Sequence, residues 1–362
     1  MRTTRTRTAL AVTAVLGGVF AVGVPGVASA ATARPTTVYT LSNAAAGNSV
    51  LAFHDAGGVL TPAGSYPTGG TGTGAGLGSQ GAVTVADDGR ILLAVNAGSN
   101  SLTALRVAHD GTLSAVSTVS SGGVQPVSVT VHGDLVYVLN AGDNSISGFR
   151  LDDGRLVPLA GSTRALSAGV GGAAEVGFSP DGRRLVVTEK ASNSLDTFTV
   201  DRHGRASAAA KTASNAAVPF GFDFDNRGDA VVSDAAASAV TTYNLRSGTA
   251  HQIAYVPDGG GAACWLVVSH RTDTAYVANA ATGTISTYDV RGGKLTLTTP
   301  VAATVGGHPT DLALADHTHT LYVRDATNGR VQAVHFGASG AQVTAAPSDL
   351  PAGAAGIAVV GG

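Results

Sequence analysis

The chain has a single cysteine, Cys264, which excludes an internal disulfide framework. We expect this thiol to be a small buried residue at the start of a strand, because free cysteines are usually buried. Aromatic residues make up only 5% of the chain and charged residues 13%. The core must therefore be built mainly from Val, Leu, Ala and Ile, and the 49 glycines suit many short strands joined by tight turns.

The sequence also lacks runs of basic residues, and its formal net charge is −2. Such a balance argues against nucleic acid or anionic lipid as a partner. The patterns GxxxxGK[ST], GxSxG and HExxH are absent, as is any set of residues with the spacing of metal ligands. Beyond residue 30 no apolar run is long enough to cross a bilayer, so we expect no membrane insertion.

Residues 1–30 have the pattern of an export signal. An apolar stretch over residues 9–24 is followed by a small-residue Ala-Ser-Ala site that ends at Ala30. The positive charges that precede the apolar stretch are Arg2, Arg5 and Arg7. We predict cleavage after Ala30 and a secreted, extracellular protein, without a lipid anchor because no cysteine stands directly after the cleavage site.

What the sequence has in abundance is repetition. Seven times a β-rich run is followed by a small or polar turn residue, a few Gly, Ala, Asn or Ser, and a second β-rich run, as in VYVLNAGDNSISGF and AYVANAATGTISTY. The key polar residue recurs every 44–53 residues. These residues are Asn43, Asn96, Asn140, Glu189, Asp234, Asn279 and Asp325. A period of this length that contains only strand-type segments is typical of a β-propeller.

The first copy lacks an innermost strand, since the chain begins there directly with VYTLSN. The run AGIAVV at 355–360 matches the missing strand. We therefore predict an all-β, seven-bladed β-propeller with four-stranded blades, formed by one domain over residues 31–362. The C-terminal strand 355–360 would join the N-terminal blade and close the ring. The Gly/Thr-rich loop at 68–79 is expected to be a linker or a mobile loop at the rim.

Alignment of the repeats places two columns of residues at one mouth of the predicted channel. The first column, at the start of the innermost strands, is Ala82, Ser128, Glu175, Gly221, Trp265, Asp311 and Gly356. The second column is the recurring polar residue. The carboxylates that fall at this mouth are Glu175, Glu189, Asp234, Asp311 and Asp325. Clustered carboxylates can supply a general base near neutrality, or bind a hard cation such as Ca²⁺.

Turn formation alone is sufficient to account for the Asn and Asp side chains of the second column, which leaves a role in binding open. Glu175 and Glu189 stand where other repeats have small or turn-forming residues, and His308 lies beside the mouth. We assign Glu175, Glu189 and His308 as candidate catalytic residues, and expect no resident cofactor. The candidate substrate-binding residues are Asn140, Asp234, Asn279, Asp311 and Asp325.

The segments AYVANAATGTISTYDV, VYVLNAGDNSISGFRLDDGRL and FSPDGRRLVVTE resemble the seven-bladed β-propeller lactonase family, which includes 6-phosphogluconolactonase, and also the shorter YVTN-type surface repeats. Lactonase propellers commonly carry Gly-Pro-Arg-His before the Phe-x-Pro-Asp-Gly turn. Here Ala174 and Glu175 stand where Arg and His would be. The positive charge that would bind a phosphorylated lactone is therefore expected to be missing. The carboxylates at the mouth would repel a phosphosugar.

The resemblance implies a secreted hydrolase of a non-phosphorylated lactone. In it, Glu175 or Glu189 would activate water, and His308 or backbone N–H groups would polarise the carbonyl. The alternative is a non-catalytic extracellular propeller that recognises a glycan, a peptide or a protein. The replacement of charged motif residues by Ala, Gly and Asn favours this alternative, so enzyme status stays open. Both hypotheses place the ligand at the central channel of a monomer.

Overall fold

The computed structural model describes residues 9, 11, 35–169, 171–346 and 349–361. The chain divides into two compact units, residues 1–33 and 34–362, and the propeller described below belongs to the second. The predicted export signal lies almost entirely outside the described residues. Within the described part, no helix is long and apolar enough to cross a membrane.

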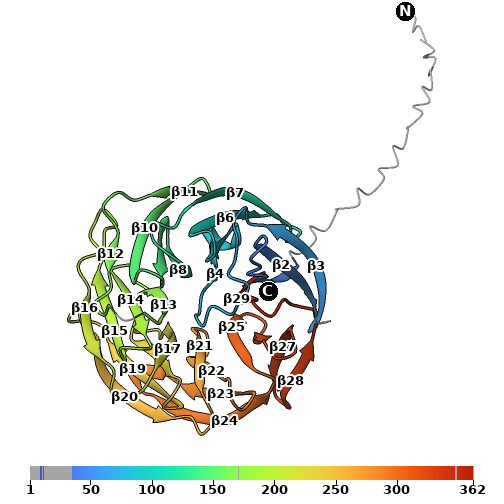
Figure 1. The fold of residues 1–362 in the computed structure, drawn as a ribbon. Helices are drawn as coiled ribbons and strands as arrows, with labels where there is room; N and C mark the ends of the chain where they lie inside the picture. Colours follow the sequence, from blue (N-terminus) through green and yellow to red (C-terminus); the bar gives the residue numbers. More distant parts are fainter. Residues whose placement is uncertain (1–8, 10, 12–34, 170, 347–348, 362) are drawn as a thin grey trace, which may run out of the picture. The chain divides into compact units, whose positions relative to one another are not determined.

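Seven antiparallel sheets form a ring, each with one strand at the channel (Figure 1). Six of them have three more strands toward the outside, and the sheet of blade 3 has four. Blades 1 to 3, each from the inside outward, are built as follows. Blade 1 contains β29 (Ala355–Val360), β1 (Thr36–Leu41), β2 (Ser49–Ala56) and β3 (Val59–Pro67). Blade 2 contains β4 (Val83–Ala86), β5 (Ile91–Asn96), β6 (Ser101–Val107) and β7 (Leu113–Ser120). Blade 3 contains β8 (Pro126–His132), β9 (Leu135–Asn140), β10 (Ser145–Asp152) and β11 (Arg155–Pro158), with β12 (Arg164–Ala165) also paired to β10.

Blades 4 to 7 repeat the same order. Blade 4 contains β13 (Ala173–Phe178), β14 (Arg184–Glu189), β15 (Ser194–Thr199) and β16 (Ala210–Ala213). Blade 5 contains β17 (Pro219–Phe224), β18 (Ala230–Asp234), β19 (Ala239–Asn244) and β20 (His251–Pro257). Blade 6 contains β21 (Ala263–Ser269), β22 (Thr274–Asn279), β23 (Thr284–Asp289) and β24 (Thr296–Thr304). Blade 7 contains β25 (Pro309–Ala315), β26 (Thr320–Asp325), β27 (Arg330–Gly337) and β28 (Gly340–Ala345). Two short 3₁₀ turns, η1 (Asp87–Gly89) and η2 (Arg291–Gly293), complete the described elements.

The ring closes as predicted, because β29 pairs antiparallel with β1 and so completes blade 1. In that pairing Thr37 lies opposite Val360 and Tyr39 opposite Ala358. The predicted seven-bladed all-β architecture is confirmed. The register also pairs the start of each inner strand with the end of the second strand, as in Ala173 with Glu189. The two columns of residues identified from the repeats therefore lie at the same end of the channel.

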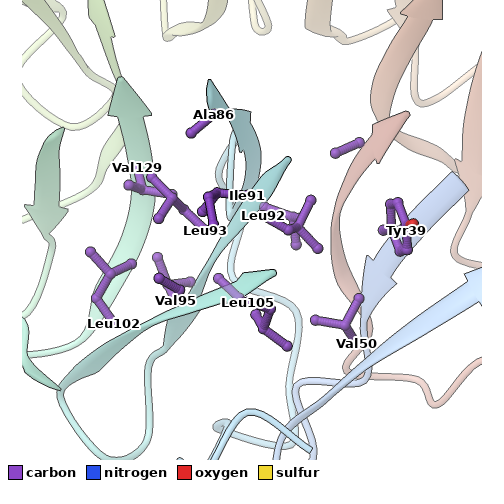
Figure 2. Close-up of a cluster of buried hydrophobic side chains, with 14 of the residues drawn as sticks. Tyr39, Val50, Ala86, Ile91, Leu92, Leu93, Val95, Leu102, Leu105 and Val129 are labelled. Atoms are coloured by element: carbon purple, nitrogen blue, oxygen red, sulfur yellow. The ribbon is translucent and has the colours of Figure 1, made fainter. Parts of the chain in front are cut away.

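The hydrophobic core lies between neighbouring blades. The second strands β5 and β9 are buried along their whole length. Figure 2 shows Leu93 and Val95 of blade 2 in the same cluster as Val129 of blade 3 and Val50 of blade 1. Small aliphatic side chains fill this space because aromatic residues are few. Cys264 is free and buried, as its position at a strand start predicted.

Several connections into the inner strands pass through a left-handed backbone conformation. Val218 has φ of +64° directly before β17, where Gln125 (φ +55°) and Gly172 (φ +96°) stand before β8 and β13. A β-branched residue is strained there, at roughly 1–2 kcal/mol, whereas glycine is not. We expect Val218→Gly to raise the free energy of unfolding by about 1 kcal/mol after its backbone entropy cost, measured by urea titration. Gln125→Gly, which relieves less strain, should gain less; a loss of stability in Val218→Gly would contradict the prediction.

The Gly/Thr-rich segment before β4 differs from the rim loop that its composition predicted. Its first part is held against blade 1, where Asn43 Nδ2 donates to Ala75 O at 2.7 Å. Residues 76–82, which we call the axial segment, then enter the centre of the ring (Figure 1). Gln80 N donates to Ala174 O at 3.1 Å, and Trp265 Nε1 donates to Ser79 O at 2.9 Å. These partners belong to blades 4 and 6, so the axial segment crosses the channel.

The inner strands present one unpaired edge to the channel, and each buried N–H there needs an acceptor. Side chains supply it from one blade to the next. Val176 N donates to Ser128 Oγ at 3.2 Å, and Phe222 N donates to Glu175 Oε2 at 2.7 Å. Glu175 is thus one member of a series of hydrogen bonds that joins neighbouring inner strands.

The axial segment completes this series of hydrogen bonds at the one position of the inner strand of blade 5 that is a glycine. Gly221 occupies the position that corresponds to Glu175, and a Cβ there would lie 2.2 Å from Gln80 Oε1. The Gln80 amide replaces the missing group: Oε1 accepts from Leu266 N at 3.0 Å and Nε2 donates to Leu266 O at 2.7 Å. Gln80 therefore pairs with the inner edge of blade 6 as a peptide group of a further strand would.

Candidate active site at the channel mouth

A pocket of about 310 Å³ lies beside the axial segment at the mouth of the channel. Its walls come from blades 1, 6 and 7 and from the axial segment itself. The polar side chains in the wall are His308, Thr310, Asp311 and Arg324, and Trp265 adds an aromatic surface. The small residues Ala326, Ala352, Ala355 and Gly356 leave the space open.

Asp311 is the carboxyl group of this pocket. It is 3% exposed, Oδ1 accepts from the N–H of Leu312 at 2.9 Å, and Oδ2 has no hydrogen-bond partner among the described residues. Its φ is +65°, a conformation that the equivalent Gly356 of blade 1 (φ +72°) adopts more readily. Burial raises the pKa of Asp311 to about 7. The carboxyl is therefore a group that gains or loses its proton near neutrality.

Arg324 brings a cation into the same pocket. It is 6% exposed, and its Nε finds no hydrogen-bond partner in the described part of the chain. Burial lowers the pKa of Arg324 to about 10, so the guanidinium stays charged at neutral pH. The expectation that the mouth has no positive charge is wrong. The residues at the equivalent position of the other blades are uncharged: Ser42, Val95, Leu139, Thr188, Ser233 and Ala278.

His308 and Asp325 are joined at the edge of the pocket. The backbone N–H of His308 donates to Asp325 Oδ1 at 3.2 Å, and Asn328 Nδ2 donates to Asp325 Oδ2 at 2.6 Å. Although burial opposes ionisation, hydrogen bonds from Asn328 and His308 and the charge of Arg330 lower the pKa of Asp325. Asp325 thus fixes the turn that carries His308, a residue of the pocket lining.

Glu175 lies in the channel, outside the residues that line the pocket. Burial raises the pKa of its carboxyl well above the usual range, although the hydrogen bond from Phe222 N opposes this. Nearby Asp311 and Asp223 add to the increase. Burial therefore favours the protonated form of the carboxyl, which connects the inner strands of blades 4 and 5 through Phe222 N.

Asn140, Asn279 and Asp234 are buried inside their own blades. Each bonds to hydroxyl groups at the start of the third strand, as in Asn140 Nδ2, which donates to Ser147 Oγ at 3.4 Å. Asn279 Nδ2 makes the same bond to Ser286 Oγ, and Asp234 accepts from the Thr241 hydroxyl. The arrangement ties the second strand to the third, and these three side chains do not line the pocket.

Glu189 occupies the same position in blade 4, but Asp196 replaces the hydroxyl residue. Asp196 accepts from Ser167 N and Oγ at 2.6 Å each. Burial, together with the hydrogen bond and charge of Asp196, raises the pKa of Glu189 to about 8. Glu189 therefore lies beside a second buried carboxyl inside the blade, and its protonated form is favoured. Over the described ranges, no three Asp, Glu, His or Cys side chains are grouped so as to hold a metal ion.

Comparison with known proteins identifies the family to which the chain belongs. The family model for the seven-bladed β-propeller lactonases matches residues 32–169 and 160–249, which together are more than half of the chain. The chain belongs to this lactonase family. No curated protein sequence matches it.

Solved structures similar to this lactonase-family propeller share its fold at low identity. A candidate 6-phosphogluconolactonase of Bacteroides fragilis is 18% identical, with a TM-score of 0.68 over 91% of this chain and 99% of that one. The periplasmic gluconolactonase of Pseudomonas aeruginosa is 18% identical, with a TM-score of 0.69 over 90% and 98%. A protein of Lactobacillus plantarum is 16% identical, with a TM-score of 0.72 over 90% and 99%.

The lactonase-family fold thus brings together two of the residues singled out from the sequence, His308 and Asp311. It adds Arg324 and Trp265, which sequence reasoning did not select. A signal for Arg324 was present, because a charged residue stands in a strand column that is otherwise uncharged. The cation of the pocket comes from β26 in blade 7, far along the chain from the FSPDG turn.

Proposed function

We propose that this protein is a secreted hydrolase of an uncharged lactone and that the reaction takes place in the pocket at the channel mouth. One observation carries the proposal: Asp311 and Arg324 both line the pocket, and Asp311 Oδ2 and Arg324 Nε are buried without a hydrogen-bond partner among the described residues. Buried polar atoms without partners are uncommon in folded proteins, and a ligand or a water molecule can supply the missing contact. An acceptor and a charged donor side by side suit a water molecule and a carbonyl oxygen.

The chemistry follows from these two groups. The Asp311 carboxylate removes a proton from water as the water oxygen attacks the lactone carbonyl carbon. The guanidinium of Arg324 donates to the carbonyl oxygen, where negative charge develops in the transition state. When the ring C–O bond breaks, the leaving alkoxide takes the proton back, with His308 positioned to pass it. The products balance as one lactone and one water giving one hydroxy acid.

An uncharged substrate suits the electrostatics of the pocket. Arg324 is its one buried cation, and the Asp311 carboxyl beside it offsets that charge once ionised. A phosphate dianion would meet repulsion from Asp311, whereas a neutral ring would not. The Pseudomonas aeruginosa neighbour is named as a periplasmic gluconolactonase. This supports a sugar lactone as the substrate class, in line with an export signal.

The test is pH-stat titration of the purified protein on a panel of uncharged sugar lactones. Asp311→Asn should lower kcat by about 100-fold, because the base is lost while the side-chain shape is kept. Asp258→Asn is the matched control: Asp258 is also a buried carboxyl, but it accepts from Gly260 N outside the pocket, and its substitution should leave kcat unchanged. Turnover no faster than in buffer, or full activity in Asp311→Asn, would refute the proposal.

The pH dependence gives a second check. Because the pKa of Asp311 is raised to about 7, the carboxyl is protonated below that pH and cannot act as a base. We expect kcat/KM to rise with pH through about 7 and then to level off. The measurement is a kcat/KM profile from pH 5 to pH 8.5, corrected for spontaneous lactone hydrolysis. A flat profile over this range would exclude Asp311 as the base.

A further inference from the structure

One wall of the pocket is formed by the axial segment and, unlike the other walls, does not come from the strands of a blade. Blades 1, 6 and 7 contribute residues on or next to sheet strands, whereas residues 76–79 form a single stretch of chain outside any sheet. The corresponding connection from β7 to β8 takes only residues 121–125 and stays at the edge of the ring. The pocket is thus closed on one side by a feature particular to the first repeat.

This wall is held from several sides. Trp265 Nε1 donates to Ser79 O at 2.9 Å, and Lys190 Nζ donates to Gly78 O from blade 4. The Lys190 ammonium also lies 4.8 Å from the centroid of the Phe220 ring, a cation–π contact that keeps it in place. Leu77 packs against two hydrophobic clusters, one formed by blades 1 to 3 and the other by blades 3 and 4. The wall therefore has a fixed position relative to Asp311 and Arg324.

Gly76 is the position in this wall where a side chain would not collide with neighbouring residues of the fold. It lines the pocket, its φ lies outside the left-handed region, and a Cβ built on it has nothing within 4 Å. A larger residue at position 76 is thus compatible with the fold, and its Cβ would enter open space next to the pocket lining. The pocket of about 310 Å³ already lies at the lower end of the range of small-molecule sites, roughly 300–1,000 Å³.

We propose that the axial segment determines substrate size, so that the site accepts a monocyclic lactone and rejects one that carries a second ring. The absence of a side chain at Gly76 keeps the pocket wide enough for that single ring. This inference rests on the proposed function, since it assigns the ligand class of the same pocket. It adds that specificity is set by the connection between blades 1 and 2 and not by the blades themselves.

The experiment measures binding separately from turnover. Trp265 is the only tryptophan of the chain and lines the pocket, so its fluorescence reports occupancy. The probe is a sugar lactam, which has the ring and carbonyl of the lactone but resists hydrolysis. Gly76→Leu should weaken lactam binding by at least about tenfold, and Gly76→Ala should weaken it less. Wild-type protein should bind the monocyclic lactam at least about tenfold more tightly than a lactam that carries a glycosyl substituent.

Gly47→Leu is the matched control. Gly47 lies in the turn between β1 and β2, a Cβ there also has nothing within 4 Å, and it does not line the pocket. Its substitution should leave lactam binding unchanged. Equal binding by Gly76→Leu and wild type, or equal binding of both lactams, would overturn the inference, as would the absence of lactam binding by wild type. Size-selective lactam binding without lactone turnover would leave the inference standing and refute only the proposed hydrolysis.

Discussion

Gln80→Met is expected to lower the free energy of unfolding by about 4 kcal/mol, because it leaves the inner edge of blade 6 without its partners. The substitution keeps the length and volume of the side chain but removes the amide that pairs with Leu266 N and O. Gln80 is 6% exposed, so water cannot replace those bonds without entering the channel. Each buried backbone group left without a partner costs about 1–3 kcal/mol. Urea denaturation followed by circular dichroism measures the difference.

Two comparisons separate this effect from ordinary loss of a glutamine. Gln342→Met changes an exposed glutamine of β28 and should alter stability by less than about 0.5 kcal/mol. Gly221→Ala places a Cβ 2.2 Å from Gln80 Oε1 and should destabilise the protein strongly on its own. Gly221→Ala combined with Gln80→Ala should cost less than the sum of the two, because the shortened side chain makes room. Stability of Gln80→Met within about 0.5 kcal/mol of wild type would mean that the axial segment does not support the ring.

Glu189→Gln is expected to stabilise the protein at pH 8 by up to roughly 4 kcal/mol and to have little effect near pH 4.5. In the folded protein the pKa of Glu189 is raised from its ordinary 4.5 to about 8 by burial and by Asp196. A folded state that holds the proton more tightly than the unfolded chain loses stability as pH rises from 4.5 to about 8. Glutamine is neutral throughout and can donate to Asp196, so the variant should escape that loss.

The measurement is a series of thermal or urea unfolding curves from pH 4.5 to pH 8.5. Asp181→Asn is the control, because Asp181 is a half-exposed carboxyl in a hairpin turn. Although slight burial opposes it, hydrogen bonds from Ser179 and Arg183 lower the pKa of Asp181. Its substitution should bring no gain at pH 8. If Glu189→Gln shows the same pH dependence as wild type, the raised pKa of Glu189 is not the cause of the loss of stability toward pH 8.

The architecture was predictable because each blade repeats the same local pattern of strands and turns. The closing strand was predictable as well, since the first repeat lacked an inner strand that residues 355–360 could supply. Glu175 and Glu189 were rightly seen as exceptions to the repeat. Their surroundings explain the exceptions differently: Glu175 joins two inner strands, and Glu189 lies beside the buried carboxyl of Asp196 inside its own blade.

The pocket at the channel mouth was harder to predict from the sequence. The Gly/Thr-rich composition before β4 has no strand or helix period, and the residues that hold the axial segment are distant in the chain. The pocket combines residues from three blades with that segment, so no local motif describes it. Arg324 is the exception, because comparison of the repeats shows it as the charged member of an uncharged column.

The axial segment has a consequence for how the chain reaches its native state. Open repeat arrays can fold unit by unit, since each repeat contacts only its neighbours. Here Gln80 bonds to Leu266, 186 residues later, and Thr40 bonds to Gly356, 316 residues later. During synthesis the first two blades emerge before their partners exist. Completion of the N-terminal half must therefore wait for the C-terminal half, a topology that favours slow and cooperative folding.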